Sequence, residues 1–263
     1  MAGVRIANVV ARTYLALVLG FLYVPIAVMI VMAFNRSPLY ELPFDFDLVW
    51  FKALAGNERL LRASFNSLAL AAANTAIATV IGTAAALGLN RYAFRARPLL
   101  ELLLLPPVTI PWLIIGTSML IFFFWTGIGR GFHAILLGHV ALSLPYVIIV
   151  VGTRLKSYGT LLEEAAASLG ASPLQAFLRV TLPVLSPGIV AGALFAFAVS
   201  FDQFVISYFL APPGTSTLPV EIYTAIRKGF TPEINAISAI IILVSMGLML
   251  AVARLFKFGG ERA

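Results

Sequence analysis

The sequence predicts an all-α polytopic membrane protein with six transmembrane helices, and three observations support this fold class. First, 61% of the 263 residues are hydrophobic and 11% are charged, whereas soluble domains carry about 25% charged residues. Second, the apolar residues gather in six intervals without Asp, Glu, Lys or Arg, each long enough for a helix that crosses a bilayer, about 20 residues. Third, these intervals do not alternate as membrane β-strands would. The intervals are 13–35, 63–90, 102–129, 131–153, 180–201 and 234–253.

The helices are expected within a single transmembrane domain that covers residues 1–263. The first interval is longer than the apolar core of a signal peptide, and no small-x-small cleavage site follows it, so we expect a retained helix. The second is rich in alanine and glycine, which let helices approach closely, so we expect it to be buried against protein. The expected helices are about 13–34, 63–89, 99–125, 132–152, 187–210 and 233–253.

Prolines mark the third and fourth helices. Pro106, Pro107 and Pro111 remove backbone hydrogen bonds and predict a kink, which either serves helix packing or lines a pathway through the protein. Pro145 is expected to interrupt the fourth helix. This helix also contains His139, and a lone histidine here is more often a hydrogen-bonded structural residue than a proton carrier.

The last two transmembrane helices and the segment between them carry start and stop residues. The fifth is expected to begin at Ser186-Pro187, a cap followed by proline at the first helical position. Residues Gly188 to Gly192 form a small-xxx-small face for close packing. The outer segment Pro219 to Lys228 predicts a short helix closed by Gly229. The sixth helix opens at Thr231-Pro232-Glu233.

The distribution of charge predicts that both termini lie in the cytoplasm. With that orientation, eleven of the 18 Lys and Arg residues fall in inner segments and seven in outer ones, as the positive-inside rule requires. Six acidic residues in the outer segments leave that face near neutral. The net charge of +7 is therefore mostly a consequence of topology and does not indicate nucleic-acid binding.

The longest inner segment, 154–186, is predicted to fold as two short helices joined by a glycine turn. Thr160-Leu161-Leu162-Glu163 fits a capping box, in which the threonine is the N-cap and the glutamate reaches back. Gly170 stands where a left-handed residue closes the first helix. Ser172-Pro173-Leu174-Gln175 is a second capping box, and its helix must end before Pro183. Such a rigid pair either covers the bundle or transmits force as a lever.

The spacing in this segment resembles the EAA signature of permease subunits of bacterial ABC importers. That signature is Glu-Ala-Ala, three residues, Gly, nine residues and Ile-x-Leu-Pro. Here it is Glu164-Ala165-Ala166, Gly170 and Val180-Thr181-Leu182-Pro183, with valine in place of the usual isoleucine. The resemblance implies that the loop docks on an ATP-binding subunit. The coupling residues would be Glu163, Glu164, Ala165, Ala166, Gly170, Leu182 and Pro183.

The resemblance also implies partners and a location. A permease of this family works in the bacterial inner membrane with two ATP-binding subunits, a solute-binding protein and a second permease, here expected to be a different one. No GxxxxGK[ST] phosphate loop occurs in the sequence, so ATP and Mg²⁺ are expected on the partner ATPase and no cofactor on this chain. Nucleotide-driven closure of the ATPases would move loop 160–183 and rock helices two to six, giving alternating access.

A second resemblance covers nearly the whole chain and is to the second permease subunit of spermidine/putrescine importers. It is densest over 160–240, in Ser200–Ser207, Leu218–Tyr223 and Thr231–Ala236. Relatives often have two acids where this chain has Asp202-Gln203, and the loss of one acid weakens the case for a dication. Opines, thiamine, phosphonates and ferric iron, which the same branch imports, stay open as alternative substrates.

The candidate substrate-side residues surround Asp202, the acid that lies inside an apolar stretch. A carboxylate at that depth is costly, so it is either a counter-charge for a cationic substrate or a residue that pairs with a neighbouring helix or caps a break. Gln203, Ser207 and Tyr208 could add hydrogen bonds to a substrate. Ser200, Gln203 and Ser207 share one helical face, and Asp202 lies off it.

Two alternatives come from other classes of protein. An ion-driven secondary transporter would carry intramembrane ion ligands and broken helices in two related halves, and the sequence has no visible repeat. A membrane-embedded enzyme would need a catalytic cluster. The sequence has two histidines, no cysteine and neither HExxH nor GxSxG, so we expect no catalytic or metal-binding residues.

Overall fold

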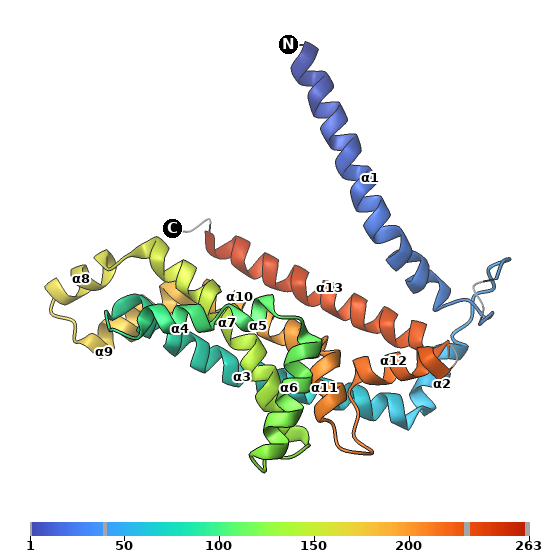
Figure 1. Cartoon of the computed structure of the whole chain (residues 1–263). Coiled ribbons are helices and arrows are strands. Elements are labelled where there is room, and N and C mark those ends of the chain that lie inside the picture. Colours follow the sequence, from blue (N-terminus) through green and yellow to red (C-terminus); the bar gives the residue numbers. More distant parts are fainter. Residues whose placement is uncertain (1, 39–40, 229–231, 261–263) are drawn as a thin grey trace. The chain divides into compact units, whose positions relative to one another are not determined.

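The computed structural model describes residues 2–38, 41–228 and 232–260, and these residues form helices and no β-strand (Figure 1). The chain divides into two compact units, residues 1–61 with 224–263 and residues 62–223. The boundaries pass through α3 (Glu58–Arg91) and α12 (Leu218–Lys228). The all-α fold class is confirmed, and the assignment of residues 1–263 to one domain stays a prediction.

The number of membrane spans is not fixed by the structure. Among the described residues, four helices are long and apolar enough to cross a membrane. The bent pair Arg97–Thr109 and Trp112–Trp125 would make a fifth span if counted as one, and the apolar stretch Glu233–Gly247 is shorter. The count of six therefore stays a prediction. The four helices are Asn8–Met32, Glu58–Arg91, Phe132–Tyr158 and Pro173–Phe201.

The first unit contains α1 (Ala2–Met32), α2 (Val49–Gly56) and α13 (Glu233–Gly260), and α13 contacts both of the others. The loop between α1 and α2 is held by buried Asn35, whose Oδ1 accepts from the Asp45 N–H at 3.0 Å and whose Nδ2 donates to the Glu41 carbonyl at 2.9 Å. Helix α12 ends at Lys228 and α13 begins at Glu233, as predicted. Gly229 and Thr231, the predicted stop and start, lie outside the described residues.

The second unit is built around α3, α7 (Phe132–Tyr158) and α10 (Leu182–Phe201). Helix α3 buries a stripe of small residues, which confirms that it packs against protein: a Cβ added at Gly82 would lie 2.7 Å from the Val147 side chain of α7. On α10, a Cβ added at Gly188 would lie 2.9 Å from Cβ of Arg154, and one added at Gly192 would lie 3.3 Å from Cγ1 of Val147. The small-xxx-small face therefore packs against α7. The buried apolar residues of the α3 stripe include Ala63, Leu70, Ala71, Ala78, Ala86 and Leu89.

The prolines have different effects in the two helices: the predicted kink of the third helix is confirmed, and the predicted interruption of the fourth is not. Helix α7 is continuous with Pro145 inside it, so the predicted interruption is wrong; neighbouring helices in a bundle can tolerate the lost hydrogen bond. The predicted helix 99–125 is instead three pieces, α4 (Arg97–Leu103), α5 (Pro106–Thr109) and α6 (Trp112–Trp125), with a bend of 111°. Ile110 is extended, with ψ of 136°, because the ring of Pro111 disfavours a helical residue before it.

The predicted fifth helix starts earlier and is broken near its end. Helix α9 (Pro173–Ala176) runs through a π-helical turn, η1 (Phe177–Thr181), into α10, so the helix does not end before Pro183. The π-turn shifts the hydrogen-bond register next to a residue that has no N–H. Ser186 is not a cap, since its hydroxyl donates to the Pro183 carbonyl at 2.8 Å. The helix then breaks at Asp202-Gln203 before α11 (Phe204–Leu210).

Candidate functional site

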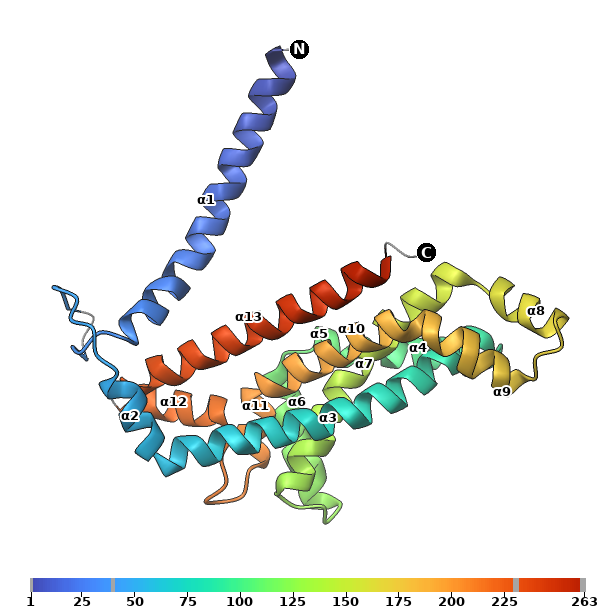
Figure 2. The same ribbon diagram turned by 180° about the vertical axis from the view of Figure 1, so that it is seen from behind.

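The segment that the sequence singles out folds as two short helices at one end of α7 and α10. Helix α8 (Leu161–Ser168) and α9 are visible at this end from both sides (Figures 1 and 2). Gly170 joins them with φ of +86°, the left-handed conformation predicted for it. The N–H of Ala171 donates to the Ala166 carbonyl at 3.0 Å, and that of Gly170 to Ala167 at 2.9 Å. These two bonds form a Schellman motif that closes α8.

The second capping box is confirmed. The N–H of Gln175 donates to the Ser172 hydroxyl at 3.3 Å, and the N–H of Ser172 donates to Oε1 of Gln175 at 2.9 Å. Pro173 occupies the first helical position, where its missing N–H costs nothing. The start of α9 is therefore specified by local sequence, and the turn at Gly170 has a fixed helix on each side.

The first capping box is wrong. Thr160 has φ of −112° and ψ of −5°, not the extended conformation of a capping residue, and its side chain accepts no bond from the helix. Its hydroxyl donates instead to the carboxylate of Glu164. Glu163 therefore does not reach back, and its carboxylate is free to bind elsewhere.

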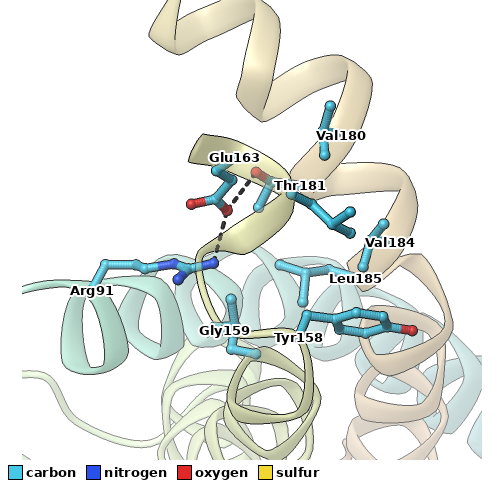
Figure 3. Close-up of a pocket in the computed structure, with 10 residues that line it drawn as sticks. Arg91, Tyr158, Gly159, Glu163, Val180, Thr181, Val184 and Leu185 are labelled. Carbon is cyan, nitrogen blue, oxygen red and sulfur yellow. Dashed lines mark hydrogen bonds and ion pairs between the residues drawn. The ribbon is translucent and has the colours of Figure 1, made fainter. Parts of the chain in front are cut away.

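Glu163 joins α8 to two other elements through one oxygen. Its Oε1 accepts from Nη2 of Arg91 at 2.8 Å and from the Thr181 hydroxyl at 2.7 Å (Figure 3). Arg91 is the last residue of α3, and Thr181 is the last residue of η1. The Arg91 and Glu163 side chains are 20% and 29% exposed, so water screens this ion pair less than a surface pair.

Two hollows flank the contact of Glu163 with Arg91 and Thr181. Both hollows are lined by these three residues. The smaller is walled by the ends of α7 and α10, including Leu155, and Figure 3 shows Tyr158 and Leu185 at this wall. The larger, about 960 Å³ of open space, lies between α8, α9 and the end of α3. Because the walls of both hollows are mainly apolar, the Glu163 carboxylate makes polar contacts within apolar surroundings. The larger hollow is also lined by Leu87, Tyr92, Ala167, Ala171, Pro173, Ala176 and Phe177.

The other predicted coupling residues lie on the outward side of α8 and at the start of α10. Glu164 and Ala165 are exposed, Ala166 is half-buried, and Leu182 and Pro183 are exposed at the start of α10. The structure adds exposed leucines that the sequence interpretation missed: Leu161 is 73%, Leu169 90% and Leu174 66% exposed. Because this segment is rich in leucine and alanine, exposed leucines could have been expected from the sequence. An apolar surface of this kind fits a partner protein.

The four predicted substrate-side residues are not brought together. Asp202 follows the last residue of α10 and is exposed, and Tyr208 is 46% exposed. Gln203 and Ser207 are buried. Gln203 is the N-cap of α11, where its Oε1 accepts from the Val205 N–H at 3.2 Å. Capping the break is one of the roles that the sequence allows for Asp202, and its neighbour Gln203 fills that role.

The buried face of this broken helix binds His139 of α7. Nδ1 of His139 lies 2.8 Å from the Ser200 hydroxyl on α10, and Nε2 lies 3.1 Å from the Ser207 hydroxyl on α11. The imidazole is 1% exposed. It therefore bridges the break from the side, which confirms the prediction that His139 is hydrogen-bonded structure. Ser200, Gln203 and Ser207 are all buried, but the break at Asp202-Gln203 separates Ser200 from the other two, so they do not share one continuous helical face.

One helical turn further along, Asn74 of α3 joins the same helices. Its Nδ2 donates to the Ser143 hydroxyl of α7 at 3.0 Å and to the Ala196 carbonyl of α10 at 2.9 Å. The sequence interpretation missed this residue, although an asparagine within an alanine-rich helix is the visible pattern. Among the residues that the structure describes, no group of three or more His, Asp and Glu side chains could hold a metal ion.

Known proteins resemble this chain in sequence and in fold. The family model described as binding-protein-dependent transport system inner membrane component matches residues 78–258. The chain is 33% identical, over 90% of both chains, to the spermidine/putrescine transport system permease protein PotC of Escherichia coli (strain K12). It is 35% identical to the putrescine transport system permease protein PotI of the same strain, over 86% of this chain and 84% of that one. A crystal structure of a bacterial ABC transporter involved in import of the acidic polysaccharide alginate has a chain with the same fold, with a TM-score of 0.70, 16% identity and coverage of 97% and 96%.

Proposed function

The chain belongs to the family of binding-protein-dependent transport system inner membrane components, and we propose that it forms half of the translocation path of an ATP-driven importer. The observation that carries this proposal is the helix pair α8–α9 with its Glu-Ala-Ala sequence and left-handed Gly170. A family match over residues 78–258 includes this loop and the helices that hold it.

The proposed assembly has two ATP-binding subunits, a second and different permease subunit, and a solute-binding protein. ATP and Mg²⁺ would be bound by the ATPase, and this chain would carry no cofactor and catalyse no reaction. The chain would lie in a bacterial inner membrane with both termini in the cytoplasm, in contact with lipid and not with nucleic acid. The distribution of Lys and Arg supports this orientation.

The outward face of α8 and α9 is the proposed docking surface for the ATPase. Glu164 would be its polar anchor, since its carboxylate is exposed. Leu161, Leu169 and Leu174 would supply apolar area that the partner covers. When the ATPases close, this surface would be pushed as a rigid body, because capping and the Schellman motif fix the turn between the helices.

Polyamines are the proposed substrates because the relatives named PotC and PotI are permeases for spermidine and putrescine. Asp202 supports this choice: its carboxylate is exposed beside the break, and the described part of the chain gives it no ion pair. Tyr208 is also exposed and could bind the same substrate. Opines, thiamine, phosphonates and ferric iron are the alternatives to be tested.

Co-purification from native membranes tests the proposed function. An affinity-tagged chain should bring down an ATP-binding subunit, and Glu164→Arg should abolish that association. Arg97→Glu, on α4, where the side chain is 36% exposed and pairs with Glu101 of the same helix, is the control and should leave it intact. Uptake into vesicles by the chain alone without ATP would instead indicate an ion-driven transporter.

Uptake of labelled spermidine and putrescine by cells that contain the whole importer tests the substrate. Asp202→Asn should raise KM while the protein level stays normal, because the variant keeps the shape of the side chain and loses its charge. Competition with unlabelled opine, thiamine, phosphonate and ferric iron checks the alternatives. If one of these competes and polyamines do not, the polyamine assignment is wrong.

A further inference from the structure

We propose that Glu163 is an internal joint that passes movement of α8 to α3 and α10, and not a contact with the ATPase. The inference rests on the proposed function, in which α8 is the element that the ATPase moves. It changes the role expected for Glu163 from its place beside the Glu-Ala-Ala sequence. The observation that carries it is the shared bonding of one carboxylate oxygen to Arg91 and Thr181 (Figure 3).

The two adjacent glutamates of α8 face different surroundings. Glu164 is exposed, and its carboxylate accepts a hydrogen bond from the hydroxyl of Thr160, the residue just before α8. Glu163 is turned toward α3 and η1, where its side chain is 29% exposed. The bonded oxygen of Glu163 is thus held by α3 and η1 of this chain, whereas the Glu164 carboxylate is bonded only to the residue before its own helix and faces outward.

The joint is the polar connection between the loop and the membrane helices. Among the described residues, no other side-chain hydrogen bond joins α8 to α3 or η1. The surrounding walls are mainly apolar side chains, several of them alanine, which can slide without breaking a directional bond. A movement of α8 therefore acts on Arg91 and Thr181 through bonds of 2.8 and 2.7 Å.

Both ends of the joint lie where a small displacement has consequences for a long helix. Arg91 is the C-terminal residue of α3, and a cation there also interacts favourably with the helix dipole. Thr181 closes the π-turn that leads directly into α10. Single π-turns in helices often mark places of functional adjustment. The joint thus connects one moving element to the two helices that pack on α7.

Charge reversal separates an internal ion pair from a contact with a partner. We would measure transport and ATPase co-purification for Glu163→Arg, for Arg91→Glu, and for the double reversal in the assembled importer. Each single reversal should lower transport by about tenfold, the effect expected of a residue that couples two sites, while the ATPase still co-purifies. The double reversal should recover about half of wild-type transport, because the two residues act on each other.

The Arg97–Glu101 pair of α4 is the matched control. It has the same kind of contact, at 2.9 Å, but its side chains are 36% and 49% exposed. Reversing Arg97 alone, or both residues, should leave transport within about twofold of wild type. Thr181→Val should lower transport, and Thr181→Ser, which keeps the hydroxyl, should restore it.

Three outcomes would overturn the proposal. One is loss of ATPase co-purification in the Glu163 reversal, to the extent seen for Glu164→Arg. Another is a double reversal no better than the worse single one with normal protein levels. If the charge-reversed variants do not reach normal protein levels, Glu163→Gln is tested in their place. Transport at the wild-type rate by this variant would also contradict the proposed role of Glu163. Failure of the wild-type chain to bind any ATPase would instead contradict the proposed function.

Discussion

At the scale of single residues, Gly170 is a position where the backbone itself excludes side chains. Its φ of +86° is unfavourable for any residue with a Cβ. Gly170→Ala should therefore destabilise the loop by about 1–2 kcal/mol and lower coupled transport. Gly88→Ala is the control, since a Cβ there meets no heavy atom and removes flexibility within α3. Thermal unfolding in detergent and uptake should both separate the two variants; equal behaviour would contradict the turn.

His139 makes a prediction about the broken helix. His139→Leu leaves the hydroxyls of Ser200 and Ser207 buried without their partner, which should cost about 1–3 kcal/mol in unfolding free energy. His139→Gln keeps a donor and an acceptor on one side chain and should recover part of the loss. Thermal unfolding measures both variants. If His139→Leu is as stable as wild type, the imidazole does not support the break.

At the scale of elements, the two predicted capping boxes allow a direct contrast. Ser172→Ala removes a cap that the structure contains and should destabilise the start of α9 by about 1 kcal/mol. Thr160→Ala removes no cap and should have a smaller effect. Hydrogen exchange of the backbone amides in 161–176 measures both. Faster exchange in the Thr160 variant than in the Ser172 variant would favour the box predicted from sequence.

Local patterns explain which elements the sequence could predict. The left-handed Gly170 and the box at Ser172 are set by neighbours in the chain, and both are confirmed. The small-residue face of α10 is also confirmed, because the spacing of its glycines alone predicts a face for close packing. The spans of α7 and α3 are close to prediction because each follows from an uninterrupted apolar stretch. Such features need no knowledge of distant contacts.

Tertiary contacts explain what the sequence could not predict. The sequence around Glu163 fits a capping box. In the structure, however, the Glu163 carboxylate binds Arg91, which lies 72 residues away in the sequence. The break at Asp202-Gln203 follows no proline or glycine, and it is supported by His139 from another helix. Continuation of the helix through Pro183 depends on a π-turn, which has no clear sequence pattern. In each case a partner distant in sequence or a shifted register decides the outcome.

At the scale of the whole molecule, large apolar side chains are left exposed in a way that water would not tolerate. Phe21 on α1 is 82% exposed, and Phe124 and Trp125 at the end of α6 are 79% and 83% exposed. Soluble monomers rarely expose extended apolar surface. Lipid and partner subunits are the surroundings that would cover these faces, in agreement with a family of inner membrane components.

Orientation in the membrane is the property on which the coupling mechanism depends. The natural chain has no cysteine, so a single introduced cysteine reports its own accessibility. Thr126 and Leu169 are both exposed, and the distribution of charge predicts that the first lies outside and the second in the cytoplasm. A membrane-impermeant maleimide should therefore label Thr126→Cys in spheroplasts and Leu169→Cys only after the membrane is opened. Lys156→Cys and Ala55→Cys, also exposed, repeat the inner and outer tests at independent positions. Labelling of Leu169→Cys from outside would put α8 on the face opposite to ATP, and no ATPase could then act on it.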